Sequence, residues 1–162
     1  PGIESAMTDL DDEQRALISH PQQELAYHCA IKGFQAGPVA SLILGAPFYA
    51  YRLRKQFSFE KFFHRLGRLT IYGTAVSVPL SLTMMYFKLK SEGFNEYKIW
   101  DRAYRLRHSA TQQRTDRFGY IAAAIGSSLA FVAPLPRRFQ LSSAAKGALM
   151  AVPFGILAHV IT

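Results

Sequence analysis

The sequence contains almost none of the residues from which catalytic and metal sites are built. Cys29 is the only cysteine in 162 residues, which excludes an internal disulfide framework and gives no support to a zinc or iron-sulfur site. The five histidines lack ligand spacing, and no glycine-rich phosphate-binding loop is present. His28 and Cys29 are adjacent, so on a helix they point about 100° apart and do not suit nucleophilic chemistry. We therefore expect no catalytic residue, no metal, no cofactor and no enzymatic activity.

Charged residues are missing from four long stretches. The uncharged runs are 33–51, 69–87, 118–136 and 147–161, the last interrupted only by His159. A helix that is apolar all round must be buried on every side, and four such helices cannot all be central in so short a chain. Lipid satisfies all four at once. We predict an all-α integral membrane protein with about four transmembrane helices; a compact soluble bundle is the less favoured alternative.

The chain divides by charge into two parts. Residues 1–29 are acidic and are expected to lie outside the membrane, while 30–162 form the four-pass membrane domain. The loop 88–117 within that domain predicts an amphipathic helix suited to a membrane surface or a partner protein. One of its faces carries Gly93, Tyr97, Trp100 and Tyr104, and another carries Lys98, Arg102 and Arg105.

The formal net charge of +8 comes from basic residues between the uncharged runs. No groove-reading or base-stacking motif accompanies them, so nucleic acid is not an expected partner. In a four-pass protein, the two short basic loops share one membrane face. They predict binding of anionic lipid head groups such as cardiolipin. The candidate residues are Arg52, Arg54, Lys55, Arg137 and Arg138.

The most specific pattern is a four-residue spacing of small side chains in every predicted span. It comprises Gly33, Gly37, Ser41 and Gly45; Gly73, Ser77 and Ser81; Gly119, Ala123 and Ser127; and Gly147, Ala151 and Gly155. Residues four apart share one helix face, and small residues there let two backbones approach closely. We predict tight helix packing through these small-xxx-small faces.

Other features of the spans indicate shape rather than transport. Pro38, Pro47, Pro79 and Pro153 interrupt the runs. Each removes an amide donor and kinks its helix, but no ionisable residue lies beside the first three, so a substrate path is not favoured. His159 is close to the end of its run and is interpreted as an interfacial histidine rather than a functional group.

The pattern as a whole resembles the inner-membrane translocase family of mitochondria, over roughly residues 25–162. That family includes protein-import channels and a four-pass accessory subunit of respiratory complex I. The segment 57–88 is similar in layout to the complex I member, through Phe62, Gly67, Tyr72, Gly73, Ala75 and Val76. The resemblance implies four tilted helices, insertion without a cleaved presequence, and termini that face the intermembrane space.

We therefore expect a non-catalytic accessory (supernumerary) subunit of the mitochondrial respiratory chain, in complex I. Its partners would be core and accessory membrane subunits of that complex, and its location the mitochondrial inner membrane. A protein-import translocase component is the alternative. Ser41, Ser77, Thr83 and Ser127 facing one cavity would favour it. A small channel or transporter is a third hypothesis.

Overall fold

The computed structural model describes residues 18–55, 58–132 and 137–161, with the side chains of 137–141 excepted. Every regular element within these ranges is an α-helix, so the all-α prediction is confirmed for them. The helices are α3 (Pro21–Leu53), α4 (Phe59–Ser91), α5 (Glu96–His108), α6 (Ala110–Val132) and α7 (Arg137–Ile161). Most of the acidic segment 1–29 lies outside the described residues. The predicted boundary at residue 30 falls inside α3.

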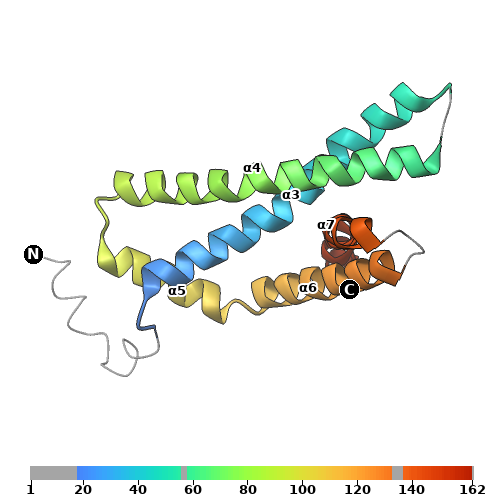
Figure 1. Ribbon diagram of the computed structural model, residues 1–162. Coiled ribbons are helices and arrows are strands. Elements are labelled where there is room, and N and C mark those ends of the chain that lie inside the picture. The colour runs from blue at the N-terminus through green and yellow to red at the C-terminus, as the bar shows by residue number, and fades with distance from the viewer. Residues whose placement is uncertain (1–17, 56–57, 133–136, 162) are drawn as a thin grey trace, which may run out of the picture.

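Two long helices, α3 and α4, form an antiparallel pair (Figure 1). Pro21 is at the start of α3, where its missing amide hydrogen breaks no helical bond. At the end of α4, Gly93 adopts a positive φ of 67°. The Gly93 and Phe94 amides donate to the Lys90 and Leu89 carbonyls, which is the pattern of a glycine-terminated helix. This turn reverses the chain and leads directly into α5.

The second pair is α6 and α7, which also run antiparallel and pack closely against each other. In Figure 1 this pair lies on one side of α3 and α4. The contact between the two pairs is made mainly by α7, which touches both α3 and α4. The described chain is therefore two helical hairpins joined by α5.

Three of these helices are long and apolar enough to cross a membrane: α3, α4, and residues Ser142–Ile161 of α7. They contain the predicted spans 33–51, 69–87 and 147–161. The remaining predicted span, 118–136, falls on α6, which begins eight residues earlier than expected, at Ala110, while 133–136 lie outside the described residues. The number of passes stays a prediction.

Many large apolar side chains point outward, while glycine, serine and threonine are prominent among the residues buried between α3 and α4. Buried positions on α3 and α4 include Gly33, Gly37, Ser41, Thr70 and Thr74. The exposed positions include Ile43, Leu44, Val76, Met84, Leu129 and Val160, each at least 64% exposed. A protein folded in water has the opposite distribution, because burial of large apolar side chains drives its folding. The arrangement suits a lipid solvent.

Helix α5 buries a face that is neither the predicted aromatic face nor the predicted basic face. Ile99 and Ala103 are its buried residues, and Ile99 packs with Leu25 of α3 and Leu89 of α4 in a small apolar core. The predicted aromatic face is only half-buried. Gly93, which we expected on that face, lies in the turn before α5, because the helix begins only after Asn95 caps the Lys98 amide.

Candidate functional site

The interface between α3 and α4 is the most closely packed surface of the first hairpin. Gly33, Gly37, Ser41 and Gly45 are all buried there. A β-carbon at Gly37 would lie 2.6 Å from the Thr74 Cα and 2.7 Å from the Thr74 nitrogen. The structure therefore places Gly33 and Gly37 where the backbone of α4 leaves no room for a side chain, whereas Gly45 lies against the Leu66 and Leu69 side chains.

Serine hydroxyls bridge the two backbones along this interface. Ser41 donates to the Leu69 carbonyl (3.1 Å), Ser77 to the Gly33 carbonyl (2.6 Å), and Ser81 to the Cys29 carbonyl (2.9 Å). Ser77 and Ser81 also lie within hydrogen-bond distance of carbonyls in their own helix. Gly73 faces Ser41 across the interface. The predicted stripes Gly33–Gly45 and Gly73–Ser81 thus face each other.

The α6–α7 interface uses the predicted stripe of α7 but a different stripe of α6. Gly147, Ala151 and Gly155 face α6. Their neighbours are Phe118, Ala122, Gly126 and Ala130: a β-carbon at Gly155 would lie 2.6 Å from Ala122 Cβ, and one at Gly147 would lie 2.6 Å from Ala130 Cβ. The stripe that contacts α7 is therefore one residue away from the predicted stripe of Gly119, Ala123 and Ser127. One residue corresponds to about 100° of helix rotation.

Gly119 instead faces α3. A β-carbon there would lie 3.3 Å from Nε2 of Gln35, and Gln35 is itself buried. Spacing alone does not decide which face of α6 contacts α7, because Ala122, Ala123 and Ala124 put a small side chain on three neighbouring faces of that helix.

A polar cluster joins α3 to α6 and was missed by the sequence reasoning. The Lys32 ammonium lies 2.7 Å from Oδ1 of Asp116, and the Gln35 amide donates to the same oxygen at 2.8 Å. The side chains of Lys32 and Asp116 are 31% and 16% exposed. Each residue lies just before an uncharged run, 33–51 or 118–136, so two half-buried charges neutralise each other where both helices enter the apolar region.

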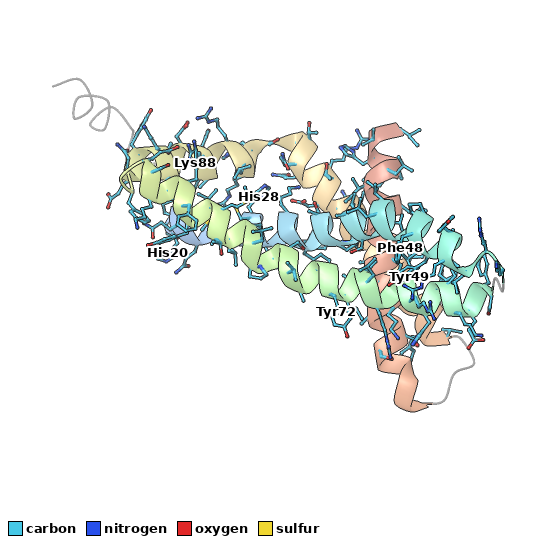
Figure 2. The ribbon with its side chains drawn as sticks, turned by 90° about the horizontal axis from the view of Figure 1, so that it is seen from above. His20, His28, Phe48, Tyr49, Tyr72 and Lys88 are labelled. Carbon is cyan, nitrogen blue, oxygen red and sulfur yellow. The ribbon has the colours of Figure 1, made fainter. Side chains whose placement is uncertain are left out.

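Two cavities lie beside α5. One, of about 370 Å³, is bordered by α3, α5 and α6 and reaches Asp116; its lining includes His28, Arg107 and Gln112. Figure 2 shows His28 on the side of α3 that faces these helices. The other, of about 460 Å³, lies between residues 18–23 and α5 and includes the predicted Tyr97 and Trp100. Neither cavity contains a group of side chains that could hold a metal ion, because no such group occurs among the described residues.

The predicted surface residues are placed as follows. Arg52, Arg54 and Lys55 are exposed at the end of α3, and the Arg54 guanidinium lies 4.9 Å from the Tyr51 ring centre. The side chains of Arg137 and Arg138 lie outside the described residues. On α5, the Trp100 and Tyr104 rings stack at 5.1 Å.

His159 is half-buried on α7, with its ring 5.9 Å from that of Phe118. Its Nδ1 atom has no hydrogen-bond partner among the atoms that the structure describes. The neighbour of the His159 ring is therefore the aromatic ring of Phe118.

Comparison with curated proteins gave no match. A family model described as "Protein of unknown function (DUF1757)" matches residues 5–162, which is nearly the whole chain. The match covers both helical hairpins, α5 and the packing faces described above. The chain therefore belongs to the DUF1757 family.

Proposed function

We propose that this protein is a non-catalytic structural subunit of a membrane complex, and specifically an accessory subunit of respiratory complex I in the mitochondrial inner membrane. The observation that carries the proposal is the distribution of side chains. Glycine, serine and threonine hold α3 to α4, while large apolar residues of four helices point outward. A subunit built this way offers lipid and neighbouring membrane subunits a broad apolar surface.

The hydroxyl groups favour packing over a translocation path. Ser41 and Ser77 donate to backbone carbonyls of the opposite helix, and the Thr83 hydroxyl donates to the Pro79 carbonyl of its own helix. A hydrophilic groove for a polypeptide in transit needs such groups to face one shared space, and these three do not. The accessory-subunit proposal is therefore preferred to an import translocase.

The assignment to complex I draws on the resemblance of residues 57–88 to the four-pass accessory subunit of that complex. The structure adds support in one respect. Helix α5 is held against the ends of α3 and α4 by Ile99, yet Tyr97, Trp100 and Tyr104 stay half-exposed. Half-exposed aromatic residues are common at the centres of protein interfaces.

Separation of mildly solubilised mitochondrial membranes on a native gradient tests the proposal. We expect the chain to migrate with NADH dehydrogenase activity, and its depletion to lower the amount of the assembled complex. Migration as a free small protein, with complex I intact in its absence, would reject the proposal. Migration with an arrested import precursor would instead support the translocase alternative.

A further inference from the structure

Basic side chains gather where α4 crosses α7. The Lys146 ammonium lies 3.4 Å from Nδ1 of His64. Lys146 reaches α4 because Gly67 has no side chain: a β-carbon there would lie 3.0 to 3.1 Å from Cβ, Cγ and Cδ of Lys146. Arg68 follows Gly67 directly and is exposed. Two cations and a histidine from different hairpins thus share one surface.

No carboxylate forms an ion pair with Arg68 or Lys146 within the described ranges, although Glu60 acts electrostatically on the His64 ring. Neither Arg68 nor Lys146 takes part in an ion pair there, whereas Lys32, Lys88, Arg102, Arg105 and Arg107 all do. Glu60 is on the same side of α4 as His64, one turn earlier, but pairs with neither cation. Unpaired cations held side by side raise each other's energy, and a bound anion relieves that repulsion.

The position of the two cations along their helices indicates the depth at which an anion would bind. Arg68 comes immediately before the uncharged run 69–87, and Lys146 immediately before the run 147–161. If these runs occupy the hydrocarbon layer, both cations lie at the level of the lipid phosphates.

The surface of α4 beyond Arg68 is apolar, like the acyl chains of a phospholipid. At four-residue intervals, His64 and Arg68 are followed by Tyr72, Val76 and Leu80, and all five are exposed. Figure 2 shows Tyr72 on the outer side of α4, away from α3. These residues form an inclined row along α4 that is basic at the head-group end and apolar along the span.

We propose that the crossing of α4 and α7 binds an anionic phospholipid. Arg68, Lys146 and the His64 ring hold its phosphate, and an acyl chain lies along Tyr72, Val76 and Leu80. This site uses none of the residues of the predicted one, which comprises Arg52, Arg54, Lys55, Arg137 and Arg138. It rests on the membrane embedding in the proposed function but not on the assignment to complex I, so either can fail without the other.

Native mass spectrometry of the detergent-solubilised full chain, titrated with phosphatidylglycerol, tests the site. The variant is Arg68→Gln with Lys146→Gln. The matched control is Lys90→Gln with Lys98→Gln, which removes two exposed cations that form no ion pair in the described chain. At about 1 kcal/mol per cation near an anionic head group, binding to the first variant should weaken about 30-fold. Binding to the control should be unchanged.

Parallel titrations separate the possible ligands. Phosphatidylcholine should bind more weakly than phosphatidylglycerol, and inorganic phosphate should not displace the lipid. Equal binding of both lipids, or displacement by phosphate, overturns the proposal. So does a loss of lipid in Arg52→Gln with Arg54→Gln while the Arg68 and Lys146 variant keeps it, because the lipid would then lie at the α3–α4 turn.

A measurement on the unchanged chain keeps the proposal testable if the variant does not fold. Phosphatidylglycerol with a photoreactive acyl chain should crosslink to the peptide that contains Tyr72, Val76 and Leu80. Crosslinks distributed over all helices without preference for that peptide contradict the site.

Discussion

At the residue scale, glycine and serine hold positions that large aliphatic residues occupy in a soluble core. Gly37 lies against the backbone of Thr74, and Ser77 donates across the same interface to Gly33. In lipid, helices gain little from burying apolar side chains, so close backbone contact and interhelical hydrogen bonds hold them together. Each contact contributes little free energy, so the stability of the helix pair comes from many contacts along the interface.

Enlarging one of these glycines is expected to separate the helices. Gly37→Leu should lower the stability of the detergent-solubilised protein by about 1–3 kcal/mol, because the added side chain meets backbone that cannot move aside. Ala36→Leu is the matched control, since residue 36 is the exposed neighbour on the same helix. The two variants are compared by thermal unfolding followed by circular dichroism. Equal midpoints would mean that the α3–α4 interface is not the one described.

The ion pair between Lys32 and Asp116 is expected to couple the two hairpins. Lys32→Met alone should lower the free energy of unfolding by about 1–3 kcal/mol, because Asp116 keeps a half-buried charge without its partner. This value lies between those expected for exposed and for fully buried ion pairs. Adding Asp116→Leu should recover part of that loss. A double-mutant cycle on the free energy of unfolding measures the coupling. Additive effects of the two changes would show that the pair contributes nothing.

At the element scale, the sequence predicted the paired faces of α3 and α4 because each carries a single stripe of small residues within an uncharged run. It failed on α6, where alanine, glycine and serine occupy several adjacent faces and only the contact with α7 selects Ala122, Gly126 and Ala130. It also missed the pairing of Lys32 with Asp116, 84 positions apart. Periodicity along one helix identifies a face, but it does not identify the partner of that face.

Helix α5 shows the same limit. Its aromatic residues predict a surface for a partner, but periodicity did not identify Ile99 and Ala103 as the residues that pack inside the chain. The inward face of a short helix depends on the ends of α3 and α4, which sequence periodicity alone does not locate.

The docking of α5 should depend on pH. Glu92, at the end of α4, accepts a hydrogen bond from Arg102 of α5 at 2.6 Å and lies 3.2 Å from the Lys88 ammonium. The Arg102 hydrogen bond is the main cause that lowers the pKa of Glu92 below its ordinary 4.5. Because the folded pKa is the lower one, this stabilisation is present above pH 4.5 and is lost as the pH falls below it.

Fluorescence of Trp100, the only tryptophan in the chain, reports on α5. We expect its emission to change as the pH falls below 4.5 in the natural sequence, and Glu92→Gln to remove that transition while shifting the emission at neutral pH. Asp101→Asn is the control, since Asp101 pairs with Arg105 within α5 itself. An unchanged acid transition in the Glu92 variant would assign the effect to another group.

At the scale of the whole molecule, two hairpins with glycine and serine at their interfaces and many large apolar residues outside suit an apolar solvent. α3, α4 and α7 have the length and composition to cross a membrane, and α6 pairs with α7 along its length. Both the proposed subunit role and the proposed lipid site depend on this solvent.

Alkaline carbonate extraction of native membranes tests that dependence most directly. Carbonate releases proteins held by charge or by contact with a membrane surface, but not proteins embedded in the hydrocarbon layer. We predict that the chain stays in the membrane pellet together with an integral membrane marker. Its recovery in the supernatant as a water-soluble monomer would contradict the account.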